Sequence, residues 1–278
     1  MDVRLRESLQ HHLSVLACPK CEADLALEDE GLRCAACQAF YGVSNNIPML
    51  FCPNQWDLAK DDVTLTVKSF YEETPFPNYD DFDNVGWLVE KARNGVFAKL
   101  LDDQIPFGAR ILECGCGTGQ MSNFLSVANR TVFGSDMSLH SLSLGQQFKE
   151  KNDLRTVHFV QMNLFRPCFK PDTFDLVICN GVLHHTSDPF LGFRTIAKLV
   201  RPRGYLLVGL YHKYGRAITI TRRFIFRTTG DRFAFLDPNF RKPETSASKK
   251  RAWLMDQYKH PHESTHTIRE AHGWVDQA

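Results

Sequence analysis

The sequence predicts an α/β protein in which a parallel sheet, with helices on both faces, follows a small cysteine-rich module. Apolar, strand-like runs alternate with helical patterns between residues 108 and 212, and this alternation is typical of a parallel sheet. Four of the nine cysteines lie close together near the N-terminus, which indicates a metal site. The length of 278 residues fits one to two domains, at about 150 residues per domain.

Charge and composition exclude several classes of protein. The chain has 33 basic and 32 acidic residues, so no overall field attracts nucleic acid or a membrane. No apolar run approaches the ~20 residues that span a bilayer, and the N-terminal segment lacks the apolar core and cleavage site of a signal peptide. An odd number of cysteines in such a chain argues against a disulfide framework. We expect a cytoplasmic protein without a membrane span.

The first element is the cysteine-rich module, residues 1–52. Its pattern C-x2-C-x12-C-x2-C is formed by Cys18, Cys21, Cys34 and Cys37. Two pairs of thiolates match the closed tetrahedral shell of structural Zn²⁺, which leaves no open position for a substrate. An iron–sulfur cluster could use the same thiolates, and four reduced core cysteines are the remaining alternative. Leucines at helical spacing before Cys18 predict a short helix that packs on the module.

A glycine loop follows the first strand of the predicted sheet, 109–113. Its glycines alternate, at Gly115, Gly117 and Gly119. A dinucleotide-binding loop needs the spacing G-x-G-x-x-G, so a nicotinamide oxidoreductase is disfavoured. We expect the alternating glycines to let the main chain pass close to a flat, largely uncharged ligand. Asp136 ends the second strand, 131–135, where a carboxylate could accept both hydroxyls of a ribose.

Three more strands are predicted at 157–161, 174–179 and 205–210. A helix, 190–200, and a turn, 201–204, separate the last two. With these motifs, residues 109–209 resemble the class I S-adenosylmethionine-dependent methyltransferases, whose sheet is Rossmann-like. The stretch Leu183-His-His-Thr-Ser-Asp-Pro189 is similar to the L-H-H-x-x-D-P stretch of methyltransferases of ubiquinone and menaquinone biosynthesis, which act on small molecules.

The resemblance implies which residues bind S-adenosyl-L-methionine. The glycines line its amino-acid moiety and ribose, Glu113 holds the loop or the ammonium group, and Asp136 holds the ribose. Met137 forms an apolar wall for the adenine, and Asn163 offers a side-chain oxygen where the family usually has an aspartate. The expected cofactor residues are Tyr71, Glu113, Gly115, Cys116, Gly117, Gly119, Gln120, Asp136, Met137, Asn163, Leu164 and Asn180.

Two regions before the core also fit the resemblance. Residues 16–51 resemble the zinc-ribbon module of tRNA-methyltransferase activator proteins, which often binds a partner protein and is fused ahead of many bacterial methyltransferases. Gly42 and Asn46 stand where that family has proline and glycine. Within the linker 53–107, the aromatic, proline-rich stretch 69–79 lies where methyltransferases often have a cofactor lid. Tyr71 could close over the cofactor, or the stretch could be a packed linker.

Catalysis by such a protein is mostly alignment and desolvation of the reacting groups. A hydroxyl or thiol acceptor would gain from a nearby base, and histidine titrates in the useful range. The candidates are His184 and His185 after the fourth strand and His212 after the fifth. For each of them, packing or helix capping is the alternative role.

The region 213–278 extends the predicted core 108–212. Between residues 213 and 251, eleven lysines and arginines face three acidic residues, and a basic, aromatic cover suggests an anionic or nucleic-acid substrate. A solvated helix face is the alternative. Further on, His260, His262, Glu263 and His266 could bind a metal or form a polar loop that faces the substrate.

The end of the chain predicts one last helix, 267–278, and no strand pair after the fifth strand. The family normally closes its sheet with an antiparallel hairpin, which is missing here. Because an open apolar edge invites aggregation, the simplest explanation is a truncated chain; a partner or local pairing could also cover the edge.

The sequence therefore favours a methyltransferase that uses S-adenosyl-L-methionine on a small metabolite, with an anionic character suggested by the basic insertion. One alternative is a methyltransferase of ribosomal or transfer RNA, in which the ribbon and the basic insertion hold phosphates. Another is a non-catalytic partner protein with the same fold. The intact glycine loop and Asp136 argue against this last alternative.

Overall fold

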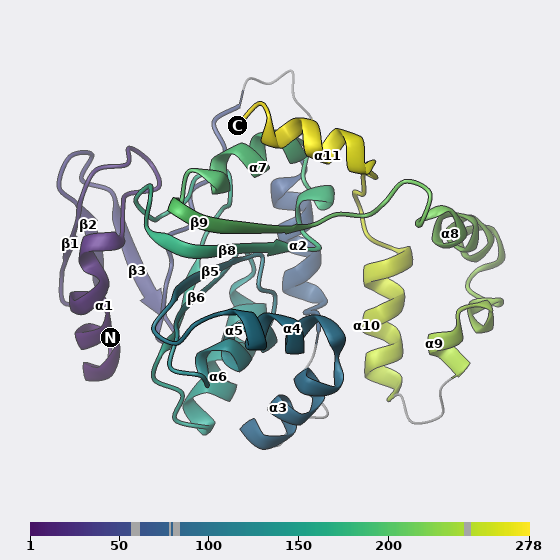
Figure 1. Ribbon diagram of the computed structural model, residues 1–278, viewed down its shortest axis with the longest axis horizontal. Helices are drawn as coiled ribbons and strands as arrows, with labels where there is room; N and C mark the ends of the chain where they lie inside the picture. The colour runs from purple at the N-terminus through teal and green to yellow at the C-terminus, as the bar shows by residue number, and fades with distance from the viewer. Residues whose placement is uncertain (57–61, 78, 80–83, 242–245) are drawn as a thin grey trace.

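The computed structural model describes residues 1–56, 62–77, 79, 84–241 and 246–278 (Figure 1). Residues 57–61 and 80–83 of the predicted linker, residue 78 of the predicted lid and residues 242–245 of the basic segment therefore lie outside the described residues.

Five parallel strands form the central sheet, in the order β7-β6-β5-β8-β9, which confirms the predicted parallel α/β fold. The strands are β5 (Arg110–Cys114), β6 (Thr131–Asp136), β7 (Val157–Gln161), β8 (Phe174–Asn180) and β9 (Val200–Gly209). The predicted turn 201–204 lies inside β9, which already starts at Val200. Val200 pairs with Phe174 and Tyr205 pairs with Leu176, so residues 201–204 form a bulge in the register. Arg203 takes a positive φ of 65° at this bulge.

Helices cover one face of the sheet and enclose an apolar core. They are α3 (Val85–Asn94), α4 (Val96–Gln104), α5 (Gln120–Ser126) and α6 (Leu139–Lys151), and Figure 1 shows them on the lower side of the sheet. Phe124 from α5, Leu142 from α6 and Phe159 from β7 are buried in this core. Apolar residues on both sides of each strand explain why the strands read as nearly continuous hydrophobic runs.

The opposite face is covered partly by helices and partly by the cysteine-rich module. Helices α7 (Pro189–Ala197) and α11 (Ile268–Val275) lie on the upper side in Figure 1, where Trp274 packs 5.8 Å from Phe193 between ring centroids. The module consists of α1 (Val3–His12) and the antiparallel strands β1 (Leu25–Leu27), β2 (Gly31–Cys34), β3 (Phe40–Ser44) and β4 (Ile47–Pro48).

The module and the sheet share one hydrophobic core. Leu32 and Leu50 of the module belong to the same cluster as Phe133 and Phe169, and the Ala17 N–H donates to the Cys168 carbonyl over 2.9 Å. Parallel strands are usually joined by a helix that covers the sheet, yet residues 162–173, all of them described, contain no helix between β7 and β8. The module therefore covers the part of the sheet that a crossover helix would cover.

Both edges of the sheet have a local neighbour. Met49 forms a parallel bridge with Gln161 of β7, and His212, just beyond β9, forms one with His266. Within the described residues β9 is the last strand of the sheet. The expected open edge is thus paired only at its end, by the chain that returns toward α11.

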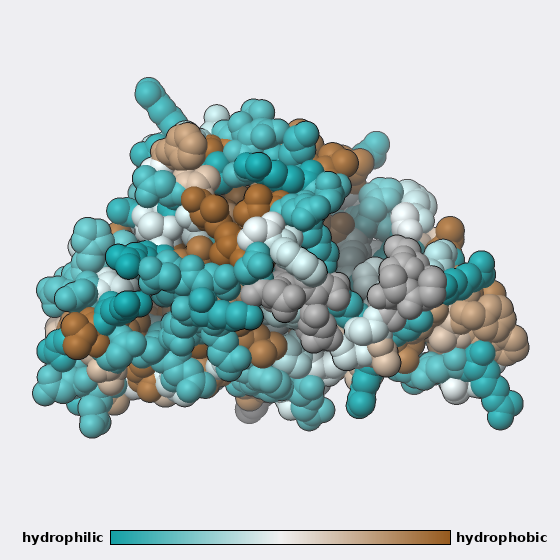
Figure 2. Space-filling view, turned by 90° about the horizontal axis from the view of Figure 1, so that it is seen from below, coloured by the Kyte–Doolittle hydropathy of each residue, from teal (hydrophilic) through white to brown (hydrophobic). Residues whose placement is uncertain are grey.

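A cover of helices lies beyond the carboxyl ends of the strands. It consists of α2 (Thr64–Glu73), α8 (Ala217–Thr229), α9 (Pro238–Arg241) and α10 (Ala247–Tyr258). Seen from below, hydrophobic side chains are exposed at the end where α8 and α9 lie (Figure 2), and Ile218 and Phe224 of α8 are 65% and 69% exposed. No helix among the described residues has the length and apolar character to cross a membrane.

Candidate active site

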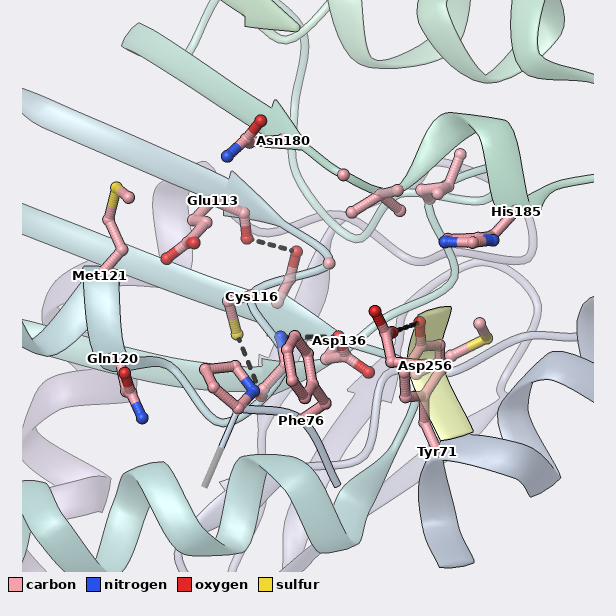
Figure 3. A pocket seen from close by; sticks show the side chains of 18 of the residues that line it. Tyr71, Phe76, Glu113, Cys116, Gln120, Met121, Asp136, Asn180, His185 and Asp256 are labelled. Carbon is pink, nitrogen blue, oxygen red and sulfur yellow. Dashed lines mark hydrogen bonds between the residues drawn. The ribbon is translucent and has the colours of Figure 1, made fainter. Parts of the chain in front are cut away.

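A cavity of about 640 Å³ lies between the carboxyl ends of the strands and the cover. The sheet order changes direction between β5 and β8, and this switch point is where α/β sheets bind ligands. Every predicted cofactor residue except Gly119 lines the cavity. Figure 3 shows Glu113 and Asn180 on one side, Asp136 and Cys116 in the middle, and Tyr71 with Asp256 on the other side.

The three glycines of the loop are required by its backbone conformation and by close packing. Gly115, Gly117 and Gly119 all have positive φ values, of 69°, 54° and 71°, which favour glycine. A Cβ atom on Gly115 would overlap the Val182 side chain, and one on Gly117 would overlap the Phe76 carbonyl. Protein atoms therefore occupy the position that a side chain would need at both glycines, while the two residues line the cavity.

Gly119 stands apart from the other two glycines. It precedes α5, and a Cβ atom there would overlap the ring of Phe159 in the core under the sheet. This glycine packs the start of α5 onto β7 and does not line the cavity. Its predicted contact with the cofactor is not supported by this geometry.

Asp136, at the end of β6, holds the glycine loop by a hydrogen bond. Its Oδ2 accepts the Gly117 N–H over 2.9 Å, and its Oδ1 accepts the Ser138 N–H over 2.8 Å. Burial raises the pKa of this carboxyl above its usual range, while the backbone N–H groups oppose that shift. A carboxylate has about four acceptor positions, so Asp136 can still accept hydroxyl groups from the cavity. The carboxylate therefore fits the predicted ribose site.

Glu113 is enclosed by protein except where it faces the cavity. The Ser122 hydroxyl donates to its Oε2 over 2.5 Å. Burial is the largest effect on this group and raises its pKa to about 7, with a further contribution from Asp136. The side chain thus holds the start of α5 and changes charge near neutral pH, where an ammonium group in the cavity would favour the ionised form.

We expect Glu113→Gln to change how stability depends on pH. The raised pKa means that the folded chain keeps the proton up to about pH 7, whereas the unfolded chain loses it near pH 4.5. The contribution of Glu113 to the free energy of unfolding is therefore present below pH 4.5 and is lost as pH rises to 7, by about 3 kcal/mol. Urea unfolding of both proteins at pH 5 and pH 7.5 should show a smaller decline in the variant; equal declines would contradict the assignment.

The predicted lid lies on the glycine loop. The Thr118 hydroxyl donates to the Pro77 carbonyl over 2.5 Å, and Phe76 lines the cavity. Tyr71 reaches the cavity from α2, and its hydroxyl donates to Asp256 Oδ1 over 3.1 Å. Burial and the nearby Asp256 raise the pKa of Tyr71 well above its usual range, so the phenol stays protonated and remains a donor.

Asn163 lines the cavity, but its amide is used within the protein. Its Nδ2 donates to the Cys52 carbonyl and to Asn54 Oδ1, over 2.9 and 2.8 Å, and its Oδ1 accepts the Phe165 N–H over 3.1 Å. The side chain thus ties the linker to the end of β7. Its contact with adenine stays a prediction, for which only the second lone pair of Oδ1 is left.

The three candidate histidines lie in different environments. His185 lines the cavity, and its Nδ1 is 2.8 Å from the His262 carbonyl. His184 is fully buried and stacks on Tyr211 at 3.7 Å between ring centroids; both ring nitrogens lack a partner, and burial lowers its pKa to about 2. His212 is exposed and accepts the Gly215 N–H. The structure brings only His185 to the cavity, because packing places His184 behind it and β9 ends before His212.

Asp256 and Gln257 also line the cavity, from α10, and were not expected as site residues. They precede the segment 260–266 that was expected to face the substrate, and they belong to α10, which extends to Tyr258. The position of Asp256 next to Tyr71 depends on the chain returning from the cover, which a local pattern does not show.

The four cysteines of the module converge. The Sγ atoms of Cys18 and Cys37 are 3.6 Å apart, those of Cys21 and Cys34 are 3.4 Å apart, and all four lie within 4.8 Å of one another. Tetrahedral zinc with bonds of ~2.3 Å separates its sulfurs by about 3.8 Å. The backbone N–H of Cys37 lowers the pKa of Cys34 to about 6, which favours the thiolate. This donor set fits structural zinc.

The other predicted metal ligands do not converge. Among the residues that the structure describes, the cysteine cluster is the one group of three or more potential ligands within metal-binding distance. Glu263 instead accepts two hydrogen bonds from Arg216 and one from Arg223. The segment 260–266 therefore packs beside the cavity, against His185 and Arg216.

The site thus combines a change of sheet order, a glycine loop after β5 and a carboxylate after β6. A family model described as "Methyltransferase domain" matches residues 112–208, about a third of the chain. An uncharacterized protein of Synechococcus is 31% identical over 163 residues, which are 56% of this chain and 39% of that protein. A ubiquinone biosynthesis O-methyltransferase of Aeromonas salmonicida is 32% identical over 119 residues, 40% of this chain and 47% of that enzyme.

Solved structures resemble the chain over its core. PKMT2 from Rickettsia typhi in complex with AdoHcy has 16% sequence identity and a TM-score of 0.49, over 61% of this chain and 38% of that chain. The chain spans less than half the length of each of these three proteins.

Proposed function

We propose that the protein is an S-adenosylmethionine-dependent methyltransferase that transfers a methyl group by direct displacement to a small molecule. The observation that carries the proposal is the cavity of about 640 Å³ with Asp136 in its lining, at the switch point of the sheet. The match of residues 112–208 to the methyltransferase family supports it. A cavity of this size suits a small acceptor.

The residues of the cavity fit the cofactor. Asp136 would accept the ribose hydroxyls, Glu113 would face the ammonium group, and Met137 and Leu164 offer apolar surface to the adenine. When bound, the cofactor supplies a methyl group on a positively charged sulfur. Tyr71 and Phe76 line that space and would exclude water from the bound cofactor, which favours a displacement reaction.

His185 is proposed as the base for an acceptor hydroxyl. Because the His262 carbonyl accepts a hydrogen bond from Nδ1, over 2.8 Å, the lone pair of the neutral ring lies on Nε2. Burial lowers the pKa of His185, so the ring is neutral and able to take a proton at physiological pH. The carbonyl of His262 thus orients the base from the cover.

We expect His185→Gln to lower kcat for a hydroxyl acceptor about 100-fold, the usual contribution of a positioned base. The affinity for S-adenosylhomocysteine should stay within about threefold, because the ring holds no cofactor group in this proposal. Initial rates and isothermal titration calorimetry measure the two quantities. His212→Gln, on the exposed histidine, is the matched control and should keep full activity; equal losses in both variants would exclude His185 as the base.

The test of the function itself uses the unmodified chain with its zinc. Titration with S-adenosyl-L-methionine should show one site, and incubation with cofactor carrying a tritiated methyl group should label a compound in a metabolite extract. Label appearing in extracted RNA or protein instead would overturn the small-molecule assignment. No heat of binding for either S-adenosyl-L-methionine or S-adenosylhomocysteine would overturn the enzyme class.

A further inference from the structure

Asp256 is a buried carboxylate that faces the cavity without a cationic partner. It is 6% exposed, and its two oxygens accept hydrogen bonds from neutral groups, the Tyr71 hydroxyl over 3.1 Å and the Gln257 amide over 2.7 Å. Among the described residues it forms no salt bridge with lysine or arginine. A buried charge is costly unless it is paired, so the carboxylate is suited to a ligand that donates to it.

A hydrogen-bond network holds this carboxylate in place. Glu263 binds Arg216 through two hydrogen bonds of 2.8 Å, and Arg216 donates to Gln257 Oε1 over 2.5 Å. Because the Gln257 oxygen faces Arg216, its Nε2 faces Asp256 (over 2.7 Å). Both arginines of the network contact Glu263 directly, and Arg216 is joined to Asp256 by hydrogen bonds through the Gln257 amide.

The charged side chains that line the cavity also favour a ligand that donates hydrogen bonds. Its charged lining consists of three acidic side chains, Glu113, Asp136 and Asp256, and one basic side chain, the solvent-exposed Lys91. The arginines of α8 do not line it. A carboxylate or phosphate placed among these groups would meet like charges, whereas a hydroxyl or an ammonium group would find an acceptor (Figure 3).

We infer that Asp256, oriented by Gln257 and Tyr71, recognises an acceptor that presents a hydrogen-bond donor, a hydroxyl or a protonated amine, and disfavours anionic acceptors. This rests on the proposed function, since it takes the part of the cavity near Asp256 as the acceptor site. It replaces the anionic acceptor that the basic composition of residues 213–251 suggested.

Three small ring compounds that differ only in one group test the inference. The protein is saturated with S-adenosylhomocysteine and titrated with benzylamine, benzyl alcohol and benzoate, and binding is followed by ligand-detected nuclear magnetic resonance. We expect benzylamine and benzyl alcohol to bind at least tenfold more tightly than benzoate. Benzoate binding as tightly as either of them, or no binding of any of the three, would overturn the inference.

Two variants test whether the preference among these three compounds depends on Asp256. Asp256→Asn should weaken benzylamine at least tenfold and leave the affinity for S-adenosylhomocysteine within about threefold. Asp237→Asn is the matched control: this buried carboxylate binds Trp253 and Tyr258 in the same cover, away from the cavity, and its loss should leave the fragment preference unchanged. Equal effects of both variants would overturn the assignment to Asp256.

The cofactor titration separates this inference from the proposed function. If Asp256→Asn weakened S-adenosylhomocysteine as much as benzylamine, Asp256 would belong to the cofactor site and the inference would fail while the function stood. If the unmodified protein bound no S-adenosylhomocysteine, the function itself would fail. The preference in the unmodified protein remains decisive even where the variant does not fold.

Discussion

Asp136→Ala is expected to weaken the binding of S-adenosylhomocysteine at least 100-fold. The buried carboxylate would accept two ribose hydroxyls, and charge-assisted hydrogen bonds contribute roughly 1.5–3 kcal/mol each. The side chain also holds the Gly117 N–H, so its loss loosens the loop. Isothermal titration calorimetry measures the affinity, and the chain should still unfold in one cooperative transition.

Asp136→Asn separates the two roles of this carboxylate. Its remaining oxygen can still accept the Gly117 N–H, but the charge and one acceptor are lost, so we expect an intermediate loss of affinity. Unchanged affinity in Asp136→Ala would show that the cavity beside residues 115–119 is not the cofactor site, and the proposed function would lose its main support.

Cys34→Ser is expected to remove zinc and to lower the midpoint of thermal unfolding by at least about 10 °C. Losing one of four ligands forfeits most of the folding energy that a structural zinc supplies, and each kcal/mol shifts the midpoint by about 2–4 °C in a chain of this size. The effect should reach the sheet, because Cys34 and Leu32 lie in the same hydrophobic cluster as Phe133 and Phe174.

Metal analysis and calorimetry check this prediction. Cys52→Ser is the matched control, since Cys52 is the last residue of the module and lies outside the ligand cluster, and it should keep one zinc per chain. If Cys34→Ser kept stoichiometric zinc, the ligand assignment would be wrong. If zinc were lost while the midpoint stayed the same, the module would not stabilise the sheet.

Sequence patterns predicted those features that depend on residues close together in the chain. The two pairs of cysteines were visible as a metal site, because their spacing lets all four face one ion. The glycine loop was visible as a pattern, but the positive φ values of its glycines were not predicted. The strands 157–161 and 174–179 were visible because both of their faces are apolar. The carboxyl-end positions of Glu113 and Asp136 then followed from the topology of a parallel sheet.

Features that depend on distant segments were not predicted. Asp256 faces the cavity because α10 returns over the strand ends and meets Tyr71, 185 residues away in the sequence. His184 and His185 are neighbours, yet one packs on Tyr211 and the other faces the cavity. The basic segment was visible as composition only, and composition does not show that the arginines of α8 are absent from the lining of the cavity.

Because the module takes the place of a crossover helix, the amount of folded protein should depend on the supply of zinc. Since the cysteine cluster and the sheet share one core, a chain translated without zinc would leave an apolar face of its own sheet bare. We expect shortage of the metal to reduce the amount of folded protein, through aggregation and degradation, while each folded molecule keeps its full turnover. The metal would then control the abundance of the protein and take no part in its chemistry.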